Sequence, residues 1–292
     1  MVDYKVHGVD ENEDFVYTRS FRKIYRMFRS LKNRKGRFVL VTGTPGTGKS
    51  ANIYTALKSL DLNVYEPALF LHNVDMSYDE VFNEFFKTLR ADLNVETNED
   101  VYKKVQEYDV VLLADKILDS EFINKEKVGL SLWTLNKGLR ALPFYFKIER
   151  ERLKHKKELK NVNIVIQTVF AFRFNGRSYD ILTDFSIFSK ILIFILKHLF
   201  EIIMITYSEE EILQIVKNNF KDTDDIAIKS YIEKYGHKPR SIFKALRNEG
   251  ETIVPKYEKG FLYGLIITTI FIIYQIIMFI IDFTTDLVNV AM

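Results

Sequence analysis

The chain has 292 residues, of which 47% are hydrophobic and 28% charged, a composition typical of a folded globular protein and not of a disordered or collagen-like chain. Its 42 basic and 39 acidic residues leave a net charge of +3, which excludes a surface that is basic throughout. The absence of cysteine excludes disulfides, thiolate zinc sites, iron–sulfur clusters and a catalytic thiol.

The N-terminal segment, residues 1–36, is predicted to contain an amphipathic helix with a basic face. Its first residues are acidic and polar and lack the apolar stretch of a secretory signal peptide. Residues 19–37 contain nine basic residues and no acidic one, and apolar residues recur between them at helical spacing. This face is either a solvated edge of the domain or a contact surface for nucleic acid or anionic lipid.

Residues 37–207 are predicted to form an α/β core. Five apolar runs predict strands, at residues 37–43, 63–71, 108–115, 161–170 and 201–207. Helical stretches such as 49–59 and 77–93 separate them, which favours a parallel sheet with helices on both faces. Pro67 indicates an edge strand or a bulge, and Ser77 with Glu80 predicts a capping box at the start of the second helix.

A complete phosphate-binding loop follows the first predicted strand. The sequence GTPGTGKS has the spacing of glycines, lysine and hydroxyl residue that holds nucleotide phosphates. Its residues are Gly43, Thr44, Pro45, Gly46, Thr47, Gly48, Lys49 and Ser50. Backbone N–H groups and the start of the next helix would bind phosphate, Lys49 would reach the β and γ phosphates, and Ser50 would bind Mg²⁺. We therefore expect ATP and Mg²⁺ as cofactors.

Asp115 ends the third predicted strand, VVLLAD, and is the expected acidic partner of Mg²⁺. A carboxylate at the end of a neighbouring strand would hold the ion through water. The alternative is an aspartate that only caps the turn after the strand.

These two elements resemble the Walker A and Walker B motifs of P-loop NTPases, and GTPGTGKS is similar to the version found in AAA+ ATPases. Residues 201–218 resemble the last core strand and the first lid helix of that family, and residues 235–246, with Gly-x-x-Pro-Arg, resemble its sensor 2 segment. The resemblance covers about residues 20–250. It implies a P-loop NTPase three-layer αβα sandwich, the nucleotide-binding core at 37–207, with a small helical lid at 208–258.

The resemblance also implies roles for residues outside the loop. Arg240 would reach the γ phosphate, and Gln167 or Thr168, at the end of the fourth strand, would take the sensor 1 role. One departure concerns Lys116, because AAA+ ATPases place a glutamate there to polarise the attacking water; Asp119 or Glu121 could substitute. The candidates for an intersubunit cation are Arg173, Arg177, Lys190 and Lys197.

Residues 261–281 are predicted to cross a membrane once, as the centre of a transmembrane helix at 259–283 that a short tail, 284–292, follows. The segment has no charged residue over 21 positions, and a helix of that length spans about 31 Å, close to the hydrocarbon thickness of a bilayer. Two lysines precede it and two aspartates follow it, which favours a cytoplasmic location for the N-terminal part. The apolar region at 185–205 contains charges and is predicted to be a buried helix followed by a strand.

Three functions fit these observations. The first is a membrane-anchored, AAA+-type ATPase, as a homo-oligomer, that couples ATP hydrolysis to conformational work on a macromolecular partner. The second is an ATP-dependent switch or signalling module with slow hydrolysis, which Lys116 favours. The third is a DNA-handling ATPase at the membrane, supported by the basic segments 19–37 and 150–160. A small-molecule kinase would need neither the lid nor the membrane segment.

Overall fold

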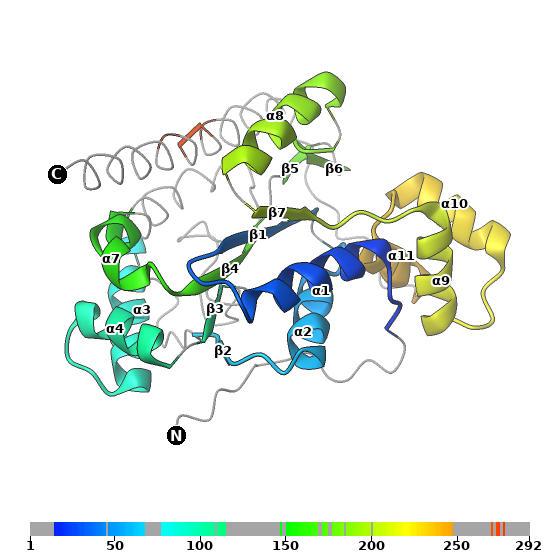
Figure 1. Cartoon of the computed structure of the whole chain (residues 1–292). Coiled ribbons are helices and arrows are strands. Elements are labelled where there is room, and N and C mark those ends of the chain that lie inside the picture. Colours follow the sequence, from blue (N-terminus) through cyan, green and yellow to red (C-terminus); the bar gives the residue numbers. More distant parts are fainter. Residues whose placement is uncertain are drawn as a thin grey trace.

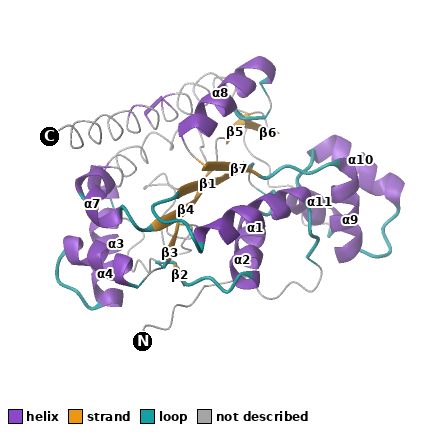
Figure 2. Cartoon of the chain, viewed as in Figure 1, coloured by secondary structure: helices purple, strands orange, loops and turns teal. Residues whose placement is uncertain are grey.

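The computed structural model describes residues 15–44, 46–67, 77–108, 110–114, 147, 150–168, 171–174, 177–183, 185–199, 201–247, 270, 273–274 and 277. Figures 1 and 2 show how its elements are arranged. The helices are α1 (Arg19–Leu31), α2 (Lys49–Ser59), α3 (Tyr78–Leu93), α4 (Asn98–Glu107), α7 (Lys156–Leu159), α8 (Ser186–Leu199), α9 (Glu209–Asn219), α10 (Asp225–Tyr235) and α11 (Pro239–Leu246). The strands are β1 (Phe38–Thr42), β2 (Val64–Tyr65), β3 (Val111–Ala114), β4 (Asn163–Thr168), β5 (Ala171–Phe174), β6 (Arg177–Asp180) and β7 (Glu201–Met204).

The main sheet has five strands in the order β2-β3-β4-β1-β7, and each neighbouring pair is parallel. This confirms the predicted α/β class with a parallel sheet, and each strand lies within one of the five predicted runs. The apolar strand β1 lies between β4 and β7, with Thr42 opposite Thr168 on one side and Met204 on the other. Strands β5 and β6 form a separate antiparallel pair that the sequence did not predict.

Helices cover both faces of the sheet, as predicted. Because successive strand residues point to opposite faces, each strand contributes to two packed layers. On β1, Val39 and Val41 belong to a buried cluster that includes residues of α1 and α2. On the opposite face, Ile164 of β4 packs in a cluster with α3, α4 and α7.

The predicted amphipathic helix is α1, and it packs directly on the core. Its buried residues are Ser20, Phe21, Ile24, Phe28 and Leu31. Asn163, a buried residue at the start of β4, holds the end of this helix and the chain that follows. Its Nδ2 donates to the carbonyls of Leu31 (3.0 Å) and Arg34 (2.8 Å), and its Oδ1 accepts from Arg37 N (3.1 Å). The basic segment is therefore fixed to the strand next to β1.

Capping interactions set two helix starts. The predicted capping box at Ser77 and Glu80 is present at the start of α3, and the same device, Ser208 with Glu211, begins α9. Helices α9, α10 and α11 then form a small helical group whose Ile212, Ile228 and Ile242 belong to the same buried cluster as β1. The group thus lies at the carboxyl end of the sheet, next to α1 and α2 (Figure 1).

Two sequence interpretations concern the sheet edges. Strand β2 has two residues and lies at one edge, as Pro67 indicated. Helix α8 precedes the edge strand β7, as predicted, but the prediction that it is buried was wrong for one of its faces. Ile187, Ile191 and Phe194 are 73%, 52% and 65% exposed, while Leu192 and Leu196 are buried. A helix packed on an edge strand has a neighbour on one side only, and a uniformly apolar sequence does not reveal which side that is.

The predicted transmembrane segment, residues 261–281, lies outside the described residues except at positions 270, 273, 274 and 277. In the described part of the chain, no helix combines the length and the apolar character needed to cross a membrane.

Candidate functional site

The predicted phosphate loop lies where the chain direction through the sheet reverses. The connection that leaves β1 leads to β2 at one edge, whereas the connection that leaves the adjacent strand β4 leads across β1 to β7 at the other edge. In open parallel sheets such a switch point, at the carboxyl ends of the strands, is where ligands bind. The residues after β1 and the last residues of β4 therefore flank the expected position of a ligand.

Two glycines give the loop its shape. Gly48, the N-cap of α2, has φ 74° and ψ 30°, and Gly46 has φ 88°, conformations that favour glycine. A Cβ atom on Gly46 would lie 3.1 Å from Arg240 Cβ, so the absence of a side chain also allows the close approach of α11. Pro45 lies outside the described residues.

Lys49 points back into the loop from the first turn of α2. The side chain is 6% exposed, and its Nζ donates to the carbonyls of Gly43 (2.8 Å) and Thr44 (3.1 Å). Thr47 closes the loop, because its N and its Oγ1 both bond to Thr44 O, at 3.3 and 2.8 Å. The result is a compact loop that places a buried positive charge directly after the central strand.

Ser50 links the loop to the end of β4. Its hydroxyl donates to Gln167 Oε1 at 3.1 Å. Gln167 is one of the two predicted sensor 1 residues; the other, Thr168, ends β4 opposite Thr42, and its side chain is not described. The structure thus brings the predicted metal ligand Ser50 beside a predicted sensor residue, across the switch point.

Arg240 lies at the loop although it is almost 200 positions away in the sequence. Its backbone N donates to Gly46 O at 3.2 Å, and it occupies the second position of α11, directly after Pro239. Proline favours the first helical position because it has no N–H to satisfy. The start of α11 therefore contacts the loop itself, which is the placement that the sequence resemblance implies for Arg240.

Tyr207 is a residue of this site that the sequence analysis missed. Its hydroxyl donates to Thr47 O at 2.7 Å and accepts from Asn52 Nδ2 at 3.0 Å. Its own carbonyl accepts a 2.7 Å bond from His237 Nδ1, which must carry the proton because a carbonyl cannot donate. Tyr207 thus joins the loop, α2 and the segment before α11. The only sequence signal was a tyrosine between an apolar strand and a helix cap.

Burial raises the pKa of Tyr207 to about 12, and the hydrogen bond from Asn52 acts in the opposite direction. The phenol therefore stays protonated throughout the physiological range. It remains able to donate to Thr47 O at every pH at which the protein would normally work.

The predicted acidic partner and its neighbours lie outside the described residues: Asp115, Lys116, Asp119 and Glu121. Asp115 follows Ala114, the last residue of β3, in the sequence, and Ala114 lies opposite Ile166 of β4. The candidate intersubunit cations are separated, since Arg173 and Arg177 belong to the β5–β6 pair and the exposed Lys190 and Lys197 to α8.

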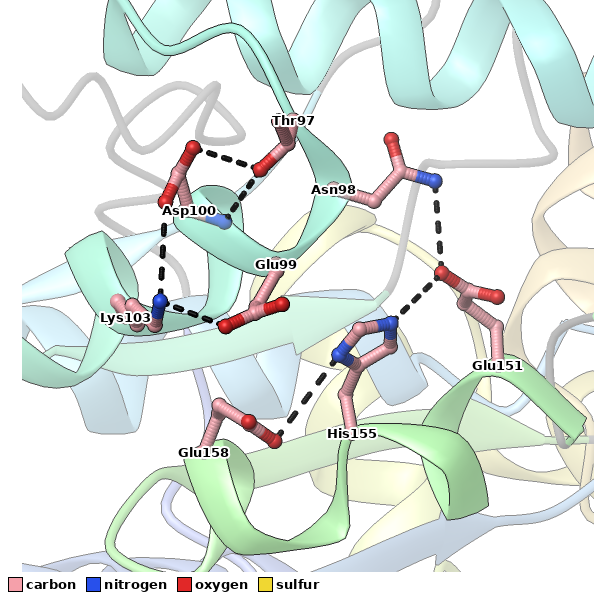
Figure 3. Close-up of polar contacts among 8 residues, drawn as sticks. All are labelled: Thr97, Asn98, Glu99, Asp100, Lys103, Glu151, His155 and Glu158. Carbon is pink, nitrogen blue, oxygen red and sulfur yellow. Dashed lines mark hydrogen bonds and ion pairs between the residues drawn. The ribbon is translucent and has the colours of Figure 1, made fainter.

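A second polar cluster joins α4 to the region of α7 (Figure 3). His155 is buried, stacks on Tyr102 with 4.5 Å between ring centroids, and has its Nε2 3.3 Å from Glu151 Oε1. Burial and the nearby Glu151 raise the pKa of Tyr102. Asn98 Nδ2 donates to Glu151 at 3.4 Å. In the described part of the chain no group of three acidic or histidine side chains is suited to hold a metal.

No protein-family model matches this chain, and no curated protein is similar enough in sequence to serve as a relative.

We expect Tyr207→Phe to lower the free energy of unfolding by about 1–3 kcal/mol, because Thr47 O and Asn52 Nδ2 lose a buried partner. The raised pKa means that the folded state retains the phenol proton above the unfolded value of about 10, so this stability is present below about pH 10 and lost as the pH rises toward 12. Urea unfolding should show a wild-type advantage that shrinks across that window.

The matched control for this prediction is Tyr231→Phe, which removes a hydroxyl from α10 at a half-buried position. Its effect should be below about 0.5 kcal/mol. Equal losses in the two variants would contradict the role assigned to the Tyr207 hydroxyl.

Proposed function

We propose that this chain binds ATP with Mg²⁺ at the loop of residues 43–50 and is an AAA+-type P-loop ATPase. The observation that carries the proposal is the buried Lys49 ammonium in a glycine loop between the central strand and a helix, at the switch point of a parallel sheet. The strand order and the helices on both faces support a three-layer P-loop sandwich, and α9–α11 support a helical lid.

The residues of the site suit the phosphates and the metal ion. The loop N–H groups and the start of α2 bind anionic oxygens, and Lys49 supplies the compensating positive charge. Ser50 and Asp115 would hold Mg²⁺, and the ion would neutralise charge on the phosphates. Gln167 or Thr168 would orient the γ phosphate, and Arg240 would offer its guanidinium to the same group. Catalysis of phosphoryl transfer depends mainly on the positioning of the phosphates and the compensation of their negative charge, and these are the two tasks that these residues would perform.

The contacts between the lid and the loop support coupling of the nucleotide state to conformational work. Arg240 N bonds to Gly46 O, and the Tyr207 hydroxyl bonds to Thr47 O. Any rearrangement of these two carbonyls therefore moves α11 or the start of α9. The work is done on a macromolecular partner, in a homo-oligomer in which one subunit supplies a cation to the next.

The second candidate is an ATP-dependent switch with slow hydrolysis. It is favoured by Lys116, a cation in the position where a glutamate would polarise water. Steady-state turnover distinguishes the two functions, because a switch binds ATP as tightly and releases phosphate far more slowly.

Loss of the lysine tests the proposed site. Lys49→Ala should weaken ATP binding by at least tenfold, because it removes the charge-assisted bonds to the phosphates. Isothermal titration with Mg-ATP measures the change, and circular dichroism checks the fold. Lys58→Ala, at the exposed far end of α2, is the control and should bind ATP normally. Equal affinities in the wild type and Lys49→Ala would place the nucleotide elsewhere.

Arg240 is predicted to contact the γ phosphate of ATP. Arg240→Ala should weaken ATP binding about tenfold and leave ADP binding within twofold, because the lost contact involves only the terminal phosphate. The ratio of the two affinities is the measurement. Arg247→Ala, at the other end of α11, serves as the control. An unchanged ratio in Arg240→Ala would show that this arginine has a structural role only.

We propose that residues 261–281 anchor the protein in a membrane, with the ATPase part in the cytoplasm. The proposal rests on the uncharged 21-residue stretch and its flanking charges. The full-length protein should remain in the membrane fraction after alkaline carbonate extraction, whereas a chain ending near Glu258 should not. Release of the full-length protein by carbonate alone would disprove the span.

A further inference from the structure

The outer side of α1 and its C-cap carry five cations: Arg22, Lys23, Arg26, Arg29 and Lys32, here called the α1 basic face. All five side chains are exposed. We propose that this face, together with the exposed ring of Tyr17, binds single-stranded nucleic acid. The proposed function leaves the class of the macromolecular partner open, and this inference names it; to that extent it rests on the proposed function. Binding of nucleic acid to the α1 basic face does not itself require ATP.

The helix geometry turns the cations into a continuous stripe. At about 100° per residue, Arg22, Lys23, Arg26 and Arg29 fall within about 120° of one another, on the side opposite the buried residues Ile24 and Phe28. The 13 residues of α1 extend over about 20 Å, long enough to follow several phosphates of one strand. In Figure 1 the helix lies across the front of the molecule.

The stripe is not neutralised within the described part of the chain. Residues 15–60 contain no aspartate or glutamate, and no described carboxylate is ion-paired with any cation of the α1 basic face. The nearest acidic contact is at the helix start, where Arg19 N donates to Glu211 Oε1 at 2.6 Å. Uncompensated cations in a row are what a phosphate backbone requires, since its binding comes largely from the release of counterions.

An exposed aromatic ring at the start of the stripe favours nucleic acid over lipid. Tyr17 is 61% exposed, and its ring is held edge-on by Phe15 (5.5 Å between centroids) and Phe21 (5.1 Å). A fixed, exposed ring, five positions before the first cation of the α1 basic face, is suited to base stacking. Insertion of α1 into a bilayer is disfavoured because its apolar residues are buried in the protein core.

Helix α1 is joined to the candidate site through the buried Ser20. Its hydroxyl donates to Thr206 O at 2.7 Å and accepts from Thr206 N at 3.0 Å. Thr206 directly precedes Tyr207, whose hydroxyl contacts Thr47 of the loop. A nucleic-acid strand bound to the exposed side of α1 is therefore connected through the helix, Ser20 and Thr206 to the contact between Tyr207 and the loop.

The test measures binding of the full-length protein to a fluorescent oligothymidylate of about 20 nucleotides by anisotropy, at low salt. Arg22→Glu/Arg26→Glu/Arg29→Glu should lower the affinity at least tenfold and reduce the slope of log K against log salt by about 2, or 0.7 for each lost phosphate contact. The matched control is Lys221→Glu/Lys229→Glu/Lys234→Glu, which makes the same charge change at exposed lysines outside both basic segments, in and just before α10, and should change the affinity less than threefold. Circular dichroism confirms that both variants fold.

Two further variants separate the contributions. Tyr17→Ala should weaken binding about fivefold or more while Tyr17→Phe retains it, because the ring and not the hydroxyl stacks. Lys49→Ala should bind the oligonucleotide normally, so failure of the ATP site and failure of the α1 basic face give different results. Equal losses in the two charge-reversed triples, or an unchanged affinity in Tyr17→Ala, would overturn the proposal. So would α1-dependent binding to phosphatidylserine vesicles without binding to the oligonucleotide.

Discussion

The buried ammonium of Lys49 is the constraint on which the arrangement of the rest of the site depends. Removing a charged amine from water costs several kcal/mol, and the cost is offset only by well-placed polar partners. The carbonyls of Gly43 and Thr44 act as such partners, which requires a tight loop. The tight loop in turn requires Gly46 and Gly48 in left-handed conformations and the hydroxyl of Thr47 folded back onto Thr44. The loop is thus held in shape by the need to compensate the buried charge of Lys49.

The loop is also held from outside by segments that are distant in the sequence. Tyr207 contacts Thr47 and Asn52, α11 contacts Gly46, and Ser20 of α1 bonds to Thr206 beside Tyr207. Because the phenol of Tyr207 keeps its proton up to about pH 12, this joint does not depend on a titration in the normal range. The loop, the helical group α9–α11 and helix α1 are therefore connected by short polar contacts, through uncharged groups.

Local signals in the sequence were sufficient for the elements that depend on near neighbours. The strand β1, the helix α2, the capping box at Ser77 and the loop itself follow from hydropathy period, cap residues and glycine spacing. Helix α4 and the β5–β6 pair were not predicted. The role of Tyr207 was missed because its partners lie 155 and 160 positions away in the sequence. The exposed side of α8 was missed because a helix that is apolar all round gives no sign of which face is buried.

The position of β1 also affects how the protein must fold during synthesis. Both neighbours of β1 come late, since β4 begins at Asn163 and β7 at Glu201. About 120 residues separate Thr42 from Asn163, so at 5–20 residues per second the ribosome needs roughly ten seconds before the first partner of β1 exists. During that interval an apolar strand has both edges unpaired, which makes the nascent chain prone to aggregation. Placing the first strand in the middle of the sheet thus leaves residues 38–42 without a partner strand until residue 163 has been made.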